Sequence, residues 1–340
     1  MPVQDTHGRA MRSLRLSVTD RCNLRCQYCM PEDEYLWLPR EDVLAYEETS
    51  QIADLFGELG VDRLRITGGE PLLRRDLPSL VAALAAKPWV GDLALTTNGV
   101  LLASAAADLK RAGLHRLTVS LDTLHRDRFE RLTRIDALPA VLAGLEEARR
   151  VGFTQIKLDT VVMRGANDDE LPALVDFARE IDAEVRFIEY MDVGGATAWR
   201  PEIVYSRREM LAALADRYGA ATPIDQDSSA PAARYRLPHG QTIGIISSTT
   251  QPFCRTCDRA RLTADGVLLL CLYAQHGTDL RRPFRAGASR ETMLNLIRAV
   301  WSGRADRGAE ERLTVRTRGS YIPVSVLKRD AHLEMHTRGG

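Results

Sequence analysis

Short runs of β-forming residues alternate with amphipathic helical stretches from residue 14 to about residue 190. This alternation is typical of parallel strands, because a parallel pair needs a crossover connection of a dozen or more residues, which is usually a helix. The predicted strands are 14–18, 63–67, 93–97, 116–121, 155–162 and 184–189. Six such units predict an α/β fold with a partial barrel, whose functional groups gather at the carboxyl ends of the strands.

The rest of the pattern divides the chain into two regions. Helices are predicted at 138–151, at 169–181 behind the capping candidate Asn167, and at 206–218. Residues 220–233 are rich in Ala, Ser, Asp and Pro, which is typical of a loop or linker. A second region begins near Arg234 and holds β-like runs, a helix around 291–301 and a polar tail. We therefore expect a barrel region at 1–218 and a C-terminal region at 219–340.

Composition limits the kinds of partner. The chain has 340 residues, and Lys plus Arg equals Asp plus Glu at 46 each. No net field would therefore attract nucleic acid or acidic lipid, and an anionic ligand needs a local cluster of positive charge. The first residues lack the apolar run of a secretion signal, and no stretch approaches the roughly 18 apolar residues of a membrane helix. We expect a cytoplasmic protein that binds neither nucleic acid nor membrane.

Six cysteines fall into two groups of three, which in a reducing compartment favours metal binding over disulfides. Cys22, Cys26 and Cys29 form the pattern C-x3-C-x2-C after the first predicted strand. Three cysteines can hold a four-iron cluster and leave one iron open to an outside ligand. A zinc site is the alternative, but it would want a fourth protein ligand nearby, and His7 lies in a start that looks unstructured. We favour an iron–sulfur cluster here.

The second group, Cys254, Cys257 and Cys271, has the spacing C-x2-C-x13-C. Taken alone it fits zinc about as well as iron, because His276 could complete a Cys3His site. Because the first group is assigned to an iron–sulfur cluster, we favour a second cluster, again with one open iron, over zinc for this group.

The first cysteine motif, with Tyr28 before its last cysteine, resembles the signature of the radical S-adenosylmethionine superfamily. The resemblance implies a TIM-like (β/α)6 partial barrel and a [4Fe-4S] cluster whose open iron binds S-adenosylmethionine. Reductive cleavage of that molecule then gives a 5'-deoxyadenosyl radical. Tyr28, Gly69, Ser120 and Met191 match S-adenosylmethionine contacts in the closest relatives, although Ser120 and Met191 by themselves resemble packing residues.

Motifs along almost the whole chain resemble the molybdenum cofactor biosynthesis protein A family, the GTP 3',8-cyclases. The matching segments are 14–22, 65–74, 96–99, 119–122, 186–191, 254–261 and the terminal Gly339-Gly340. The resemblance implies that the radical takes the 3' hydrogen of GTP and that C3' bonds to C8, giving (8S)-3',8-cyclo-7,8-dihydroguanosine 5'-triphosphate. This is the first step of molybdenum cofactor biosynthesis. A second [4Fe-4S] cluster, on an α+β C-terminal region that completes the site, would hold the guanine.

The same resemblance assigns residues to GTP and to catalysis. The matching GTP contacts are Arg15, Arg65, Thr96, Lys157, Arg259, Ala260 and Arg261. The matching catalytic residues are Arg15, Arg259, Arg261, Gly339 and Gly340. By local chemistry alone, each basic residue reads as an ordinary surface ion pair, because 46 basic residues supply many such coincidences.

The implied partners are a low-potential electron donor and, downstream, cyclic pyranopterin monophosphate synthase. A homodimer is kept as a hypothesis. Two other classes of protein stay open: a radical peptide maturase, which usually has more cysteines in its C-terminal region and no need for Arg259 and Arg261, and a zinc-stabilised binding protein without chemistry.

Overall fold

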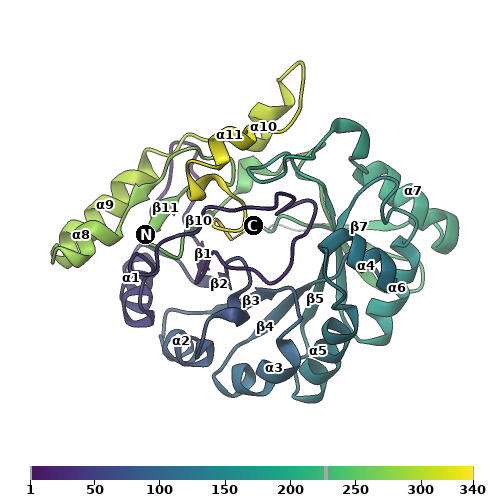
Figure 1. The fold of residues 1–340 in the computed structure, drawn as a ribbon, viewed down its shortest axis with the longest axis horizontal. Helices are drawn as coiled ribbons and strands as arrows, with labels where there is room; N and C mark the ends of the chain where they lie inside the picture. The colour runs from purple at the N-terminus through teal and green to yellow at the C-terminus, as the bar shows by residue number, and fades with distance from the viewer. Residues whose placement is uncertain (1, 226–228, 340) are drawn as a thin grey trace.

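The computed structural model describes residues 2–225 and 229–339. Its strands form one open sheet in the order β12-β11-β10-β1-β2-β3-β4-β5-β6-β9-β8-β7. The sheet curves around a lumen, and the crossover helices lie outside it (Figure 1). The prediction of an α/β partial barrel is confirmed.

Six consecutive parallel strands form the barrel wall, as the sequence pattern predicts. Each predicted strand agrees with an observed strand to within one residue at either end. The strands are β1 (Ser13–Ser17), β2 (Arg63–Thr67), β3 (Asp92–Thr97), β4 (Arg116–Ser120), β5 (Ile156–Val162) and β6 (Glu184–Glu189). The main helices of this region are α1 (Tyr46–Glu58), α2 (Leu77–Ala85), α3 (Leu102–Arg111), α4 (Arg126–Thr133), α5 (Leu138–Arg150), α6 (Leu171–Glu180) and α7 (Arg207–Tyr218).

Apolar residues alternate with polar residues along the wall strands, and the two sets face opposite ways. In β1, Leu14 and Leu16 are fully buried in the main core, whereas Arg15 between them lines the lumen. In β2, Leu64 pairs in register with Leu14, and Arg65 pairs with Arg15. Because side chains alternate across a strand, the apolar face packs on the helices and the lumen keeps charged side chains. The centre of this barrel is therefore not a packed apolar core. Its charged side chains can bind an ionic ligand.

Strands of the C-terminal region extend both edges of the barrel wall. On one edge β10 (Arg259–Leu262) pairs in parallel with β1, followed by β11 (Val267–Leu269) and β12 (Thr278–Asp279). On the other edge β9 (Thr242–Ile246) pairs in parallel with β6, followed by β8 (Ala233–Arg236) and β7 (Thr222–Ile224). The prediction of a loop or linker over the whole of 220–233 is therefore wrong, because β7 lies inside this range and pairs with β8.

Of two residues that precede predicted helices, one caps its helix and the other does not. Ser206 begins α7 and forms a capping box with Glu209, so the predicted start of that helix is confirmed. Asn167 does not cap α6, whose N-cap residue is Glu170. The Asn167 side chain instead accepts a bond from the Met163 backbone and donates to the backbone carbonyls of Asp122, after β4, and of Val161 in β5. An Asn before a helix can bond either to the first amides of that helix or to other backbone groups nearby. Here it bonds to backbone groups outside the helix.

The first residues of the chain, which the sequence suggested to be unstructured, pack on the C-terminal region. Arg9 is buried, pairs with Asp5 at 2.5 Å and donates to the Cys254 carbonyl at 2.9 Å. Trp301 of α9 (Arg290–Ser302) is fully buried and donates to the Arg9 carbonyl at 3.1 Å. The segment is ordered because it satisfies buried polar groups of a region distant in sequence.

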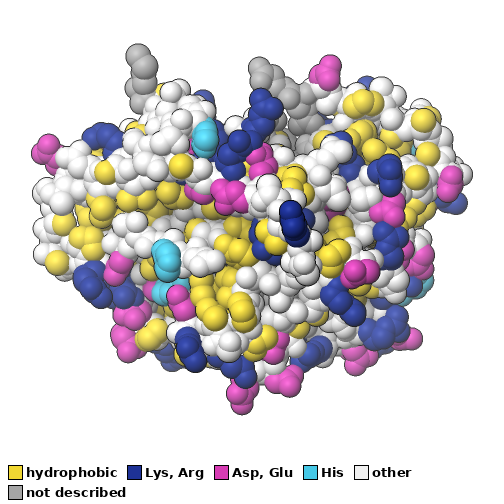
Figure 2. Space-filling view, turned by 90° about the horizontal axis from the view of Figure 1, so that it is seen from above, with side chains coloured by type: hydrophobic (Ala, Val, Ile, Leu, Met, Phe, Trp, Pro, Cys, Tyr) yellow, Lys and Arg dark blue, Asp and Glu magenta, His cyan; other side chains and the backbone are white. Residues whose placement is uncertain are grey.

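Shorter elements complete the C-terminal region, namely α8 (Arg281–Arg285), α10 (Gly308–Leu313) and α11 (Val324–Leu327). After α11 the chain turns back, and its end lies over the middle of the barrel (Figure 1). On the face shown in Figure 2, acidic and basic side chains are interspersed, as expected for a chain without net charge. In the described part of the chain, no helix has the length and apolar character to span a bilayer.

We predict that Trp301→Ala lowers the free energy of unfolding by about 3–5 kcal/mol, because it removes the largest fully buried side chain and leaves a cavity. Urea denaturation followed by circular dichroism under anaerobic conditions measures the change. Leu313→Ala is the control, since Leu313 is 48% exposed and its truncation should change stability by less than about 0.5 kcal/mol. Equal effects of the two substitutions would contradict the packing role of Trp301.

Candidate functional site

The barrel lumen holds one cavity of about 420 Å³ that both cysteine groups line. The cavity is also lined by most of the residues that the sequence predicted for S-adenosylmethionine and GTP. These are Arg15, Tyr28, Arg65, Gly69, Thr96, Ser120, Lys157, Met191, Arg259 and Arg261. Ala260 is different, because it is fully buried in the main core and does not line the cavity. Only its backbone could meet a ligand. Gly340 lies outside the described residues.

The first cysteine group lies on the loop between β1 and α1. The Cys29 and Met30 amides donate to the Cys26 carbonyl, which curls the loop so that its cysteines line the lumen. Arg25 fixes the curl by donating to the Cys22 carbonyl at 2.9 Å. Burial raises the pKa of the Cys26 and Cys29 thiols well above the usual value. A thiolate at these positions therefore needs a compensating positive charge, which bound iron supplies.

The segment Gly68-Gly69-Glu70 clamps this loop against the barrel. The amide of Gly69 donates to the Thr19 carbonyl at 2.8 Å, and a Cβ on Gly69 would overlap the backbone of Arg21. The buried Glu70 carboxylate accepts bonds from the Thr97 hydroxyl and the Asn98 amide, both at 2.7 Å. The glycines are thus required by backbone packing, in addition to the S-adenosylmethionine contact that remains a prediction for Gly69.

The predicted S-adenosylmethionine contacts come from different strands but face one cavity. The Tyr28 hydroxyl donates to Asp122, which follows β4, at 2.9 Å. Ser120 is the last residue of β4, and Met191 follows β6. The carboxyl ends of parallel strands meet at one rim, so residues far apart in sequence converge there.

The second cysteine group lies beside β10 and is surrounded by arginine. Arg259 and Arg304 donate to the Cys257 sulfur at 3.5 and 3.4 Å. Burial would raise the pKa of this thiol, but the two guanidinium groups outweigh burial and lower the pKa to about 6. The Tyr273 amide donates to the Cys271 sulfur at 3.4 Å. Cys257 is thereby prepared as a thiolate, the form that binds iron.

Both cysteine groups fit iron–sulfur clusters. Their six thiols are free and partly buried, and all line the same cavity. Among the described residues, no three His, Cys, Asp or Glu side chains converge closely enough to hold a single metal ion. Cluster thiolates bind separate iron atoms and are spaced more widely than the ligands of one ion. His276, the residue considered for a zinc site, is exposed and does not line the cavity.

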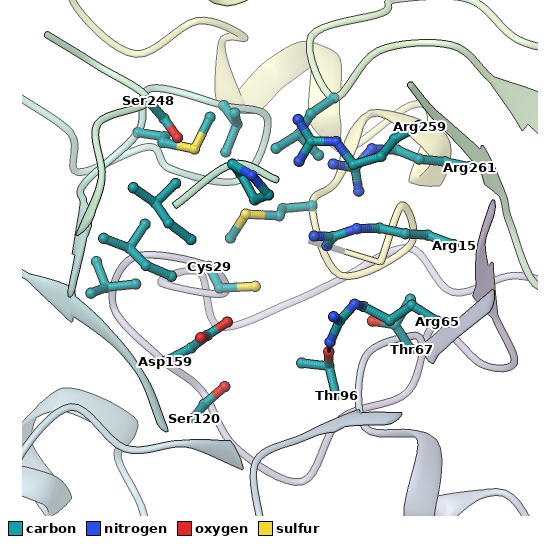
Figure 3. Close-up of a pocket in the computed structure, with 18 of the residues that line it drawn as sticks. Arg15, Cys29, Arg65, Thr67, Thr96, Ser120, Asp159, Ser248, Arg259 and Arg261 are labelled. Carbon is teal, nitrogen blue, oxygen red and sulfur yellow. Dashed lines mark hydrogen bonds between the residues drawn. The ribbon is translucent and has the colours of Figure 1, made fainter. Parts of the chain in front are cut away.

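Three arginines stand in one row across neighbouring strands, since Arg15 pairs in register with Arg261 on one side and with Arg65 on the other. In Figure 3 these side chains and Arg259 enter the cavity from one wall. Burial, with repulsion from neighbouring arginines, lowers the pKa of Arg15 well below its usual value. Burial also lowers the pKa of Arg65 and Arg261 to about 10. Cations crowded in this way form a site for an anion.

The C-terminal tail enters the same cavity. The Gly339 carbonyl accepts bonds from Arg261 at 2.8 Å and from Arg15 at 3.1 Å. Arg338 is buried and donates to the Leu272 carbonyl at 2.7 Å, beside the second cysteine group. Gly194 lies directly under the tail, and a Cβ there would overlap the Leu333 carbonyl oxygen. The tail is therefore held by backbone contacts that its own sequence does not reveal.

The charged cavity-lining residues that sequence reasoning missed include Arg186, Asp159 and Arg304. For Arg186 and Asp159 a signal existed, because both occupy lumen-facing positions in the alternation of β6 and β5. Arg304 follows α9 and had no signal, since only folding brings it to Cys257.

Comparison with known families agrees with this geometry. Residues 16–178 match the Radical SAM superfamily, and residues 183–310 match Molybdenum Cofactor Synthesis C. The crystal structure of SuiB of Streptococcus suis bound to S-adenosylmethionine superposes with a TM-score of 0.58 at 16% identity, over 91% of this chain and 72% of that one. This likeness concerns the fold alone. Fold, cysteine loop and family match together define a radical S-adenosylmethionine enzyme.

Relatives that match over most of this chain identify the family within this class of enzymes. "GTP 3',8-cyclase 3" of Mycobacterium bovis is 56% identical over 343 residues, covering 100% of this chain and 91% of the relative. "GTP 3',8-cyclase 1" of Mycobacterium tuberculosis is 55% identical over 342 residues, covering 99% of this chain and 95% of the relative. A GTP 3',8-cyclase of Acidothermus cellulolyticus is 47% identical over 326 residues, covering 92% of this chain and 89% of the relative. The chain belongs to the GTP 3',8-cyclase family.

We predict that Lys157 reacts with amine-acylating reagents near neutral pH. Burial, with repulsion from Arg186 and Arg116, lowers the pKa of Lys157 to about 7. The neutral amine is the nucleophile, so labelling should rise as pH increases through about 7. Mass spectrometry of labelled peptides gives the profile, with the exposed Lys328 as the reference on the same chain. A Lys157 profile that coincides with that of Lys328 would contradict the perturbed environment.

Proposed function

We propose that this chain is a GTP 3',8-cyclase that binds GTP in the barrel cavity and converts it to the 3',8-cyclised nucleotide, the first step of molybdenum cofactor biosynthesis. The observation that carries the proposal is that two cysteine groups and a row of arginines line one cavity. Membership of the GTP 3',8-cyclase family supports the same conclusion.

The cofactors are two [4Fe-4S] clusters and S-adenosylmethionine. We propose that Cys22, Cys26 and Cys29 hold the first cluster, with S-adenosylmethionine beside it, and that the second group of cysteines holds the other. When bound, the first cluster and S-adenosylmethionine supply the radical chemistry that abstracts hydrogen from the nucleotide. Tyr28, Gly69, Ser120 and Met191 are the proposed S-adenosylmethionine contacts.

The basic residues of the lumen are proposed to bind the triphosphate. Two unit charges about 4 Å apart attract by roughly 4 kcal/mol in the effective dielectric near a protein surface. Several cations that face one cavity can therefore hold a triphosphate firmly. Lys157 supports the assignment, because it makes no ion pair within the described residues while lining the cavity. Arg65 is already oriented, since it donates to the hydroxyls of Thr96 and Thr118 at 3.1 and 2.9 Å.

The guanine is proposed to lie against the second cluster, where Arg259 and Arg261 adjoin the cysteines. The tail is proposed to act on Arg15 and Arg261. Its Gly339 carbonyl bonds to both side chains, which fixes the direction of their remaining N–H groups. Donors that are held in place before the substrate binds need no reorganisation during the reaction. The family motif supports Gly340 as a further catalytic residue.

The proposal extends to the division of the chain, its partners and its location. We propose that residues 1–218 and 219–340 contribute one cluster each to a shared site. A low-potential electron donor is required, because reductive cleavage of a sulfonium needs the low end of the cluster potential range. Cyclic pyranopterin monophosphate synthase would take the product. A cytoplasmic location and a homodimer complete the proposal.

The function can be tested with anaerobically reconstituted protein, dithionite, S-adenosylmethionine and GTP. We expect 5'-deoxyadenosine and the cyclised nucleotide together, detected by chromatography and mass spectrometry. Formation of 5'-deoxyadenosine without a cyclised nucleotide would show that the substrate assignment is wrong. Zinc without labile sulfide in anaerobically purified protein would favour a structural metal protein instead.

A second prediction concerns the tail. Gly339→Ala should lower turnover of GTP about 100-fold, a loss typical of small displacements of catalytic groups. Gly339 has a φ of 65°, and a Cβ there would overlap Thr67 and lie 2.8 Å from the Ser17 hydroxyl. The substitution should leave iron and sulfide content unchanged.

Gly319→Ala is the matched control for the tail substitution, because a Cβ at Gly319 meets no atom within 4 Å. It should retain turnover near that of the unmodified chain. If Gly339→Ala and Gly319→Ala turn over GTP equally well, the tail does not act in the way proposed.

A further inference from the structure

Asp159 is an acidic residue among the cations of the lumen. It lies in β5, where it pairs in register with Ser120 of β4 on one side and with Arg186 of β6 on the other. Figure 3 shows Asp159 and Ser120 on the wall opposite Arg15 and Arg65. The carboxylate is therefore placed across the cavity from the proposed phosphate-binding arginines.

The Asp159 carboxylate has no hydrogen-bonding partner in the described chain. Its Oδ1 atom is buried and accepts no hydrogen bond among the residues that the structure describes, although Asp159 feels the charge of Arg15 and Arg65 through space. Other cavity-lining carboxylates are satisfied, since Asp92 accepts from Arg116 at 2.7 Å and Asp122 accepts from Tyr28 at 2.9 Å. A buried acceptor without a donor costs free energy, so its retention points to a donor that arrives with a ligand.

The charge of Asp159 decides which part of a nucleotide it can face. A carboxylate repels phosphate, so the triphosphate must lie away from Asp159, toward Arg15 and Arg65 and toward Lys157, which is two residues earlier in β5. The guanine is assigned to the second cysteine group, which lies beside β10. The ribose then remains between the base and the phosphates, and its hydroxyls are uncharged donors. One such hydroxyl satisfies the free oxygen without bringing negative charge to it.

We propose that Asp159 accepts a hydrogen bond from a ribose hydroxyl of the bound nucleotide and thereby selects ribonucleotides over deoxyribonucleotides. The inference rests on the proposed function, since it takes GTP as the ligand of this cavity. Asp159 is in this respect a specificity-determining residue. Its contact also holds the sugar in a fixed position between the two cysteine groups.

Binding of nucleotide analogues tests the proposal directly. The dissociation constants of GTP, 2'-deoxyGTP and 3'-deoxyGTP are measured by calorimetry on anaerobic holoenzyme that carries both clusters. We expect at least one deoxy analogue to bind about 10- to 100-fold more weakly than GTP, as is typical for loss of a hydrogen bond to a charged group. The weaker analogue identifies the hydroxyl. If both analogues bind as tightly as GTP, the proposal is wrong.

Variants separate a ribose contact from a structural role. Asp159→Leu, which keeps the branched arrangement of side-chain atoms but has no acceptor, should weaken GTP binding while leaving the weaker deoxy analogue unchanged, so that their ratio approaches one. Asp159→Asn keeps an acceptor oxygen and should retain most of the discrimination. If Asp159→Leu weakens GTP and both analogues by the same factor, the residue only balances charge, and the proposal fails.

Two controls make the result unambiguous. Asp92→Asn alters a cavity carboxylate that is already bonded to Arg116, and it should keep the ratio of the unmodified protein. A change of the ratio in this control would overturn the assignment to Asp159. If the unmodified holoenzyme binds no GTP and forms no cyclised product, the proposed function itself fails. If it binds GTP without regard to the ribose hydroxyls, only the present inference fails.

Discussion

The parallel pairing of β10 with β1 is the interaction on which the site depends. It joins residue 15 to residue 261 in register, across almost the whole length of the chain. Through this pairing the second cysteine group, with Cys254 and Cys257 before β10 and Cys271 after β11, reaches the lumen that the first cysteine loop caps. Without it the chain would hold two cysteine motifs with no shared cavity between them. With it, both face one cavity.

The same register concentrates positive charge. Arg65, Arg15 and Arg261 stand on three adjacent strands, and strands lie about 5 Å apart, so repulsion between such neighbours is of the order of a few kcal/mol. Folding tolerates this because the strand backbones and the apolar outer face are fully paired and packed. The repulsion is relieved when an anion binds. The site thus keeps part of the free energy of folding as affinity for its substrate.

The tail and the N-terminal segment show how remote parts of the chain stabilise this arrangement. Gly339 accepts from two of the crowded arginines, and its carbonyl dipole partly offsets their charge. Arg9 contacts the carbonyl of Cys254 from the other end of the chain. Both contacts involve backbone carbonyls, which every residue carries. Such contacts leave no mark in the residue types of either partner.

The sequence by itself determined the wall of the barrel and the kind of chemistry. The β-forming runs gave the position of strands such as 14–18 and 63–67, but by local chemistry Arg15 and Arg65 read as surface ion pairs, and only the family resemblance assigned them to the site. The spacing of Cys22, Cys26 and Cys29 indicated an incompletely ligated cluster, because three thiolates on one short loop are a local feature. Only the tertiary structure decided that Arg304 contacts Cys257 and that Gly339 lies in the lumen. It also decided that Asn167 bonds to the Asp122 backbone instead of capping α6, and that residues 222–224 form a strand. These depend on partners far away in sequence, and pairing across such distances is set by packing of the whole chain rather than by local pattern.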